Sequence, residues 1–294
     1  MRLPTFLIIG VQKAGTSSIY HYLKQHPQVY MSPVKETNFL GKDWSKIPPD
    51  SSNKNRIDTW EKYCQLFQDV KDEIAIGEAS PNYLFNYQFS AQLIQHYLPQ
   101  AQMIAILRNP VARAHSDYLM HIRDGIGNGM SLAEQIKLRT NSSFTLRKGF
   151  YYTPVKHYFD TFTKEQVKIY LYEDLCSNSV ALMQDIYQFI GVDNSFCPNT
   201  DKKYQVAQVP KLKLVNNLLR TENLPRTIVS SVLKYFLPLT FRQNIRSRLI
   251  KMNSKDKKQA LLSAEERQQL VELYREDILK LQDLIQRDLS SWLT

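Results

Sequence analysis

The sequence predicts an α/β fold in which a doubly wound, central parallel sheet is flanked by helices. Short apolar runs, which are typical of buried parallel strands, recur up to residue 191 with helical stretches between them. A glycine-containing loop joins the first apolar run to the first helical stretch. After residue 191 the strand signals stop and helical patterns continue, so helical additions are expected at the C-terminal side.

Each predicted element has its own signal. The strands are expected in the apolar runs TFLIIG (5–10), EIAIGEA (73–79), AQMIAILR (101–108) and QVKIYLYE (166–173). The first helix is expected from about Ser17. Amphipathic patterns predict further helices at 211–220 and 225–250. The last helix opens with Ser263, three residues before Glu266, which is the spacing of a capping box.

Composition indicates an ordinary globular protein. The 294 residues are 43% hydrophobic and 22% charged, and no repeat or low-complexity linker divides them, so a single domain over 1–294 is expected. No apolar run approaches the roughly 20 residues that span a bilayer, and MRLPTFLIIG shows no cleavage site. Cys64, Cys176 and Cys197 are widely spaced, which suggests neither a disulfide framework nor a zinc site. A cytoplasmic protein without a transmembrane segment is expected.

The net charge of +10 is concentrated in one stretch. Residues 201–258 hold 14 Lys and Arg against three Asp and Glu. Two interpretations remain open, a solvated basic surface or an electrostatic funnel for an anionic cofactor or polymer. The amphipathic part of this stretch is expected to pack on the sheet domain as a lid, and contact with a membrane surface is the less favoured alternative.

The loop after the first strand, GVQKAGTSS at 10–18, predicts an anion site in a P-loop-like fold. Its glycines keep the spacing of a nucleoside-triphosphate loop, but Thr16 stands where that loop has its lysine, and Lys13 lies inside the loop. Loop amides, the helix N-terminus and the hydroxyls of Thr16, Ser17 and Ser18 would hold a phosphate. The ligand is expected to be shorter than a triphosphate tail. Among the acidic residues only Glu78 ends a strand, so a metal requirement is not expected.

Two motifs resemble sulfotransferases that use 3′-phosphoadenosine 5′-phosphosulfate (PAPS). QKAGTSS is similar to their 5′-phosphosulfate loop, and AILRNPVARAHSDYL has an arginine and a serine at the spacing that grips the 3′-phosphate. The resemblance continues through LRKGFYYTPVKHYF and VKIYLYEDL to the end of the chain. It implies binding of PAPS and of its product PAP by Lys13, Ala14, Gly15, Thr16, Ser17, Ser18, Arg108 and Ser116.

Within that family the chain is most similar to the heparan-sulfate-type carbohydrate enzymes. MSPVKETNFL places Glu36 where those enzymes have the general base, with Lys35 beside it to hold the base ionised or to touch an anionic acceptor. The resemblance further implies cofactor contacts from these residues: Gly149, Tyr151, Lys202 and Lys203. One departure is Ala79, because the resembling enzymes have a lysine in that segment.

The resemblance implies a PAPS-dependent sulfotransferase that transfers a sulfonate to a carbohydrate-like hydroxyl, with Lys13 neutralising charge on the leaving phosphate. The partners would be PAPS and a hydroxyl acceptor such as an anionic saccharide, without nucleic acid and without a metal. Two alternatives are a P-loop nucleotide kinase, which leaves Arg108 and Ser116 unexplained, and a protein that only binds polyanions. A histidine base, such as His115, is less favoured than Glu36.

Overall fold

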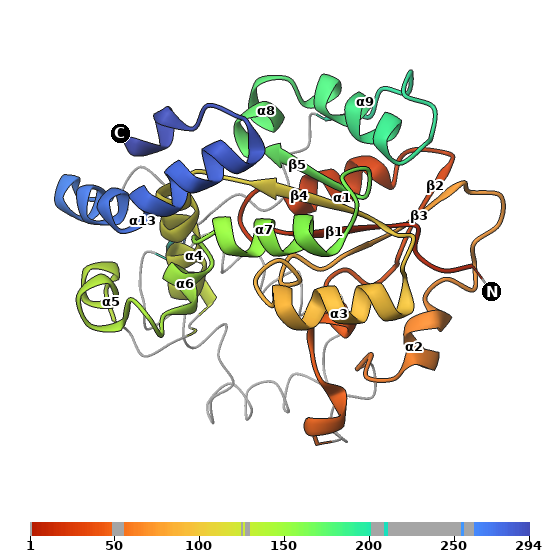
Figure 1. Ribbon diagram of the computed structural model, residues 1–294, viewed down its shortest axis with the longest axis horizontal. Helices are drawn as coiled ribbons and strands as arrows, with labels where there is room; N and C mark the ends of the chain where they lie inside the picture. The colour runs from red at the N-terminus through yellow and green to blue at the C-terminus, as the bar shows by residue number, and fades with distance from the viewer. Residues whose placement is uncertain are drawn as a thin grey trace, which may run out of the picture. The chain divides into compact units, whose positions relative to one another are not determined.

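The computed structural model describes residues 2–48, 56–124, 126, 130–200, 209–210, 254–255 and 262–294 (Figure 1). The chain divides into two compact units. The first comprises Met1–Arg113, Lys148–Gln205 and Tyr274–Thr294, and the second comprises Ala114–Arg147 and Val206–Leu273. A single domain over 1–294 stays a prediction.

A five-stranded parallel sheet forms the centre of the first unit, with the strand order β2-β3-β1-β4-β5. The strands are β1 (Phe6–Gly10), β2 (Val29–Met31), β3 (Ala75–Ala79), β4 (Gln102–Leu107) and β5 (Val167–Leu171). The doubly wound parallel sheet and all four predicted strands are confirmed. The sequence prediction missed β2, whose three residues are too few to produce a periodic signal.

Helices cover both faces of this sheet. They are α1 (Thr16–Leu23), α2 (Trp60–Gln65), α3 (Tyr87–Tyr97), α7 (Tyr152–Thr161), α8 (Tyr172–Ser177) and α9 (Ser179–Phe189), with short 3-10 turns η1 (Phe39–Gly41), η2 (Trp44–Lys46) and η4 (Ser290–Leu293). Figure 1 shows α1, α8 and α9 on one side of the sheet and α3 and α7 on the other. Both faces of β1 are therefore covered, and all five of its residues are buried.

The second unit contains most of α4 (Pro110–Asp124), with α5 (Leu132–Arg139), α6 (Phe144–Arg147) and a two-stranded antiparallel pair of β6 (Val209–Pro210) and β7 (Ser254–Lys255). Helix α13 (Ala264–Ile285) begins here. Its predicted capping box is confirmed, because Ser263 N–H donates to Glu266 Oε2 and Glu266 N–H donates to Ser263 Oγ, both at 3.1 Å. The amphipathic segments at 211–220 and 225–250 lie outside the described residues.

None of the described helices is both long enough and apolar enough to cross a bilayer. The three cysteines, Cys64, Cys176 and Cys197, are free thiols.

Strand β3 carries one carboxyl group into the core of the sheet. Glu78 is 0% exposed and lies beside Leu7 of β1. Its Oε1 atom accepts hydrogen bonds from Ser80 Oγ (2.5 Å) and Thr37 Oγ1 (3.2 Å). No donor among the described residues reaches Oε2, which is fully buried. Burial disfavours the charged form and raises the pKa of Glu78 from 4.5 to about 7.

This burial predicts a pH-dependent difference in stability between the wild-type protein and Glu78→Gln. The folded-state pKa lies above the unfolded value, so the contribution of Glu78 to stability is complete below about pH 4 and is lost as the pH rises through 7. A pKa difference of this size corresponds to about 3 kcal/mol. The free energy of unfolding of Glu78→Gln, relative to that of the wild type, should rise by up to that amount between pH 5 and pH 8. Chemical denaturation at the two pH values measures this difference. A constant difference between the two proteins would contradict a raised pKa.

Candidate functional site

The carboxyl ends of the central strands meet at one edge of the sheet, where nucleotides bind in doubly wound folds. β1 ends at Gly10, β3 at Ala79 and β4 at Leu107, and the three strands are parallel. The residues that follow them therefore share this edge. They include the loop with Lys13 and the residue Arg108.

The loop between β1 and α1 is tightly turned and has no room for a side chain at Gly15. Gly15 has a φ of 90°, and a Cβ atom there would lie 2.6 Å from Leu175 Cδ2 and 3.2 Å from the Tyr172 ring. Lys13 also has a positive φ, of 75°. Thr16 begins α1, so the loop leads directly into the helix N-terminus, whose first amides have no partner within the helix. An anion in front of this turn would be stabilised by those amides.

Arg108, the first residue after β4, contacts this loop. Its Nη1 donates a hydrogen bond of 2.9 Å to the carbonyl oxygen of Lys13. The guanidinium group also lies over the ring of Tyr172, with 4.5 Å between Cζ and the ring centroid. Two motifs that lie 95 residues apart in the sequence are therefore in direct contact.

The segment 148–152, which precedes and opens α7, approaches the same loop. Lys148 Nζ donates a hydrogen bond of 2.6 Å to Gln12 Oε1. Tyr151 is 1% exposed, and its hydroxyl donates to the carbonyl oxygen of Arg108 at 2.9 Å. Burial raises the pKa of Tyr151, which keeps this hydroxyl a donor. Tyr151 thus holds the backbone of Arg108.

Helix α13 anchors this segment. Asp277 Oδ2 accepts from the N–H of Tyr151 at 2.7 Å, and both carboxylate oxygens accept from the N–H of Tyr152 at 3.2 Å. Burial raises the pKa of Asp277 to about 6. Gly149 packs so closely on α13 that a Cβ atom there would lie 2.7 Å from the Tyr274 ring. The carboxylate of Asp277 therefore caps the N-terminus of α7 and fixes the turn that presents Lys148 and Tyr151.

Glu36 lies between β2 and η1 in an unusual backbone turn. Glu36 and Asn38 have φ values of 62° and 52°, in the left-handed region that non-glycine residues rarely adopt. Glu36 N–H donates to the carbonyl oxygen of Ala79 at 2.8 Å. Its carboxylate pairs with Lys35 Nζ at 2.5 Å, and its side chain is 36% exposed. The carboxylate is therefore accessible from solvent and has a cation beside it.

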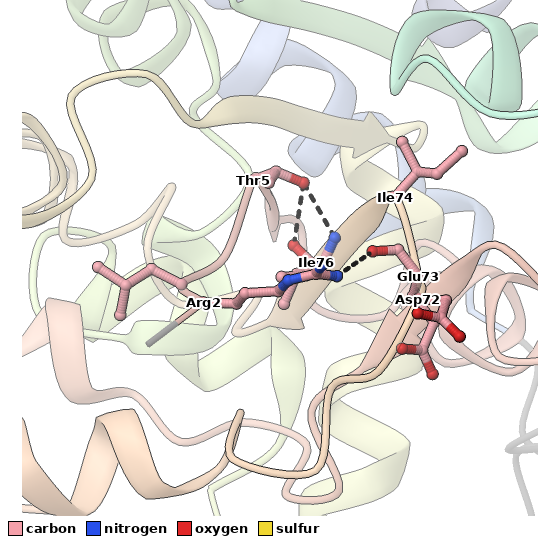
Figure 2. A pocket seen from close by; sticks show the side chains of 7 residues that line it. Arg2, Thr5, Asp72, Glu73, Ile74 and Ile76 are labelled. Atoms are coloured by element: carbon pink, nitrogen blue, oxygen red, sulfur yellow. Dashed lines mark hydrogen bonds between the residues drawn. The ribbon is translucent and has the colours of Figure 1, made fainter.

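Two cavities within the first unit lie at the other edge of the sheet, where the strands begin. One, of about 390 Å³, is lined by residues that precede β1 and by residues before and within β3, where Arg2 donates to the carbonyl oxygen of Glu73 (Figure 2). The second, of about 870 Å³, includes Gln102 and Val167 at the starts of β4 and β5. Neither contains a residue of the phosphate loop.

The other predicted site residues lie elsewhere in the fold or outside the described residues. Ser116 is buried on α4 in the second unit. Lys202 and Lys203 lie outside the described residues, as does most of the basic stretch 201–258. Within the described ranges, no three or more His, Cys, Asp or Glu side chains are grouped as metal ligands would be. Independence from a metal stays a prediction.

Lys148, Tyr172 and Asp277 were not among the residues predicted from the sequence. Lys148 stands directly before the glycine of LRKGFYYTP, and this position beside a Gly-x-Tyr segment was the available signal. Tyr172 follows β5 immediately, as Arg108 follows β4, so its place at the strand end could also have indicated it. Asp277 lies inside a long amphipathic helix, where no local pattern distinguishes it from a surface carboxylate.

Among known proteins, the chain is similar in sequence to several sulfotransferases. It is 31% identical over 121 residues to the membrane-associated sulfotransferase kil1 of Dictyostelium discoideum, which covers 41% of this chain and 24% of that protein. It is 27% identical over 209 residues to the bifunctional heparan sulfate N-deacetylase/N-sulfotransferase 2 of Homo sapiens, covering 65% of this chain and 22% of that protein. The chain thus spans about a quarter of the length of these two relatives.

A solved structure matches the whole chain. A sulfotransferase from Alicyclobacillus acidocaldarius aligns over 100% of both chains with a TM-score of 0.72 and 28% sequence identity.

The model of the family described as "Sulfotransferase family" matches residues 4–195. That range includes the phosphate loop, Glu36, Arg108 and the segment 148–152. The chain therefore belongs to the sulfotransferase family.

Proposed function

We propose that this protein is a PAPS-dependent sulfotransferase that acts on a hydroxyl of a carbohydrate-like acceptor, with Glu36 as the general base. One observation carries the proposal. Arg108 contacts the backbone of Lys13, so the two motifs that resemble the 3′-phosphate and 5′-phosphosulfate contacts of such enzymes form one cluster. Membership of the sulfotransferase family supports the reaction class.

The residues at this edge fit an anionic nucleotide. Gly15 lets the loop turn tightly against Leu175 and Tyr172, and α1 begins directly after it, so that the helix N-terminus would favour an anion. Three cationic residues lie in or beside the loop. Lys13 is part of it, and Arg108 and Lys148 contact it. PAPS, when bound, supplies a sulfonate carried on its 5′-phosphate. Arg108 would bind the 3′-phosphate in this arrangement, because a guanidinium group suits the geometry of phosphate oxygens.

Glu36 would remove the proton from the acceptor hydroxyl. A sugar hydroxyl is a poor nucleophile until a carboxylate within hydrogen-bond reach accepts its proton. The Glu36 carboxylate is partly exposed, and Glu36 Oε1 contacts Lys35. Lys35 would also offer a cation to an anionic acceptor.

Lys13 and the loop amides would neutralise the negative charge that develops on the leaving phosphate oxygen. Their position is fixed before the reaction, since Arg108 and the turn at Gly15 hold the loop backbone. Preorganised donors of this kind stabilise a transition state more than the ground state. No further covalent chemistry is required of the protein.

The relatives support a saccharide acceptor, because one is described as a heparan sulfate N-deacetylase/N-sulfotransferase and another, from Mus musculus, as carbohydrate sulfotransferase 15. The direct test is sulfonate transfer from labelled PAPS to a panel of acceptors. The panel should contain desulfated heparan fragments, chondroitin fragments, a neutral glycolipid and a simple secondary alcohol. Transfer to saccharides is expected. Transfer to the alcohol alone would exclude the carbohydrate class, and failure with every acceptor would exclude the proposed reaction.

Binding of PAP should stabilise the protein without magnesium. At a PAP concentration of a hundred times the Kd, linkage adds about 2.7 kcal/mol to the unfolding free energy. Differential scanning fluorimetry should show a rise in Tm with PAP in the presence of a chelator and a much smaller rise with ATP. A nucleotide kinase would give the opposite order and would depend on magnesium. A protein that only binds polyanions would be stabilised by heparin and by neither nucleotide.

Arg108→Ala should weaken PAP binding by about ten- to a hundredfold, the cost of one charge-assisted contact. Because Arg108 also holds the loop carbonyl, binding of adenosine 5′-phosphosulfate, which lacks the 3′-phosphate, should fall by less. Calorimetry with both nucleotides measures the difference. Arg2→Ala is the matched control, since Arg2 also donates to a backbone carbonyl but at the other edge of the sheet (Figure 2). Equal losses for both nucleotides would mean that Arg108 acts only on the loop.

Glu36→Gln should reduce kcat by about 10² to 10⁴, because the amide is nearly isosteric but cannot accept the proton. PAP affinity should stay within about twofold, because Glu36 is expected to face the acceptor and not the nucleotide. Glu73→Gln, at the opposite edge, is the control. Steady-state kinetics at saturating donor and acceptor measure the kcat of both variants and of the wild type. If Glu36→Gln kept more than about a tenth of the wild-type kcat, the loss would be too small for removal of a positioned base. If His115→Ala lowered kcat instead, the base would be a histidine.

A further inference from the structure

Side-chain hydroxyl groups accept hydrogen bonds from the backbone of the turn at residues 36–39, which carries Glu36. Asn38 N–H donates to Ser80 Oγ at 3.0 Å, and Phe39 N–H donates to Thr37 Oγ1 at 3.3 Å. Both hydroxyls therefore accept a hydrogen bond from an amide of this turn. Each hydroxyl must then donate its own proton elsewhere, or it loses part of its hydrogen-bonding capacity in a buried place.

The acceptor for both protons is one atom. Ser80 Oγ and Thr37 Oγ1 both donate to Glu78 Oε1, at 2.5 Å and 3.2 Å. A single carboxylate oxygen thus fixes the orientation of both hydroxyls, and each hydroxyl fixes one amide of the Glu36 turn. All three side chains are buried, with Glu78 and Ser80 at 0% and Thr37 at 8% exposure.

A carboxyl group at this place is unfavourable for stability alone. Glu78 Oε2 is buried without a donor among the described residues, and an apolar side chain of similar volume would avoid that desolvation. The backbone it supports is also strained, since Glu36 and Asn38 both adopt the left-handed conformation. The buried carboxyl group of Glu78 is costly to desolvate but supports a strained turn. This combination indicates that the 36–39 turn must be held in one geometry.

We propose that Glu78 is a positioning residue for the candidate base: through Ser80 and Thr37 it fixes the 36–39 turn and so directs the carboxylate of Glu36. This inference rests on the proposed function for the role of Glu36. The contribution of Glu78 is geometric and depends on its acceptor oxygen. Tyr83 completes the support, because its hydroxyl lies 3.3 Å from Thr37 Oγ1 and accepts from Leu40 N–H at 3.2 Å.

Three variants separate positioning from folding. Glu78→Leu removes the acceptor but fills the space with an apolar side chain. Glu78→Gln keeps one acceptor oxygen without the charge. Ile76→Val, two residues earlier on the same strand, is the control that lowers stability through a small core cavity without touching the turn.

In steady-state kinetics, Glu78→Leu should lower kcat by about ten- to a hundredfold at saturating substrates, the cost of a base displaced by about 1 Å. Its Tm should fall, because the buried hydroxyls of Ser80 and Thr37 lose their acceptor, and PAP affinity should stay within about twofold. Glu78→Gln should recover at least about tenfold of the lost kcat, whereas Ile76→Val should lower the Tm and keep the wild-type kcat. Wild-type kcat in Glu78→Leu, equal damage in Glu78→Gln, or a parallel loss of PAP binding would each overturn the proposal.

A second measurement does not depend on activity. Hydrogen exchange monitored by mass spectrometry or NMR should show the amides of Asn38 and Phe39 protected in the wild type and in Glu78→Gln. The same amides should exchange at least about tenfold faster in Glu78→Leu, while amides of β3 keep their protection. Unchanged exchange in Glu78→Leu would reject the positioning role even if its kcat were low. If the wild type failed to transfer sulfonate, the exchange result would still decide whether Glu78 holds the turn.

Discussion

The hydrogen bond from Arg108 to the carbonyl oxygen of Lys13 is the contact on which the candidate donor site depends. It joins the ends of two adjacent strands, β1 and β4, and thereby sets the loop against the residue that follows β4. Arg108 is itself held, because the Tyr151 hydroxyl donates to its carbonyl oxygen and Asp277 accepts from the amide of Tyr151. Contacts that reach back to α13 thus hold the loop backbone. Such prior ordering reduces the entropy that a bound nucleotide would otherwise lose.

The sequence predicted the centre of the fold well, because buried parallel strands and a glycine loop leave strong local patterns. Four strands, the start of α1 and the Ser263 capping box follow from neighbouring residues alone. The strand β2 escaped because its pairing with β3, and not its own three residues, makes it a strand. Lys148 and Asp277 escaped for a related reason. Their significance lies in contacts with residues more than a hundred positions away, which no local pattern records.

The structure around Glu36 was predicted only in part. Glu36 was identified through a family pattern, but nothing in its neighbourhood predicts that a glutamate and an asparagine adopt the left-handed conformation. Glu78 was considered only as a strand-end metal partner. In the folded chain its Oε1 accepts from the hydroxyls of Ser80 and Thr37, so its carboxyl group serves the backbone of a different segment. The sequence alone does not show which role a carboxylate within a strand has. Its hydrogen-bond partners decide the role, and tertiary packing supplies those partners.

The anchoring of the 148–152 segment by α13 has a consequence for the order in which the protein assembles. All five strands of the sheet lie before residue 172, so the sheet can form while the chain is still being synthesised. Asp277 follows its partner Tyr151 by 126 residues, and closing a loop of that length is slow compared with forming local structure. A nascent chain would therefore carry a finished sheet and an unfinished candidate site. Binding competence would arrive late, as a single event, when the last helix docks.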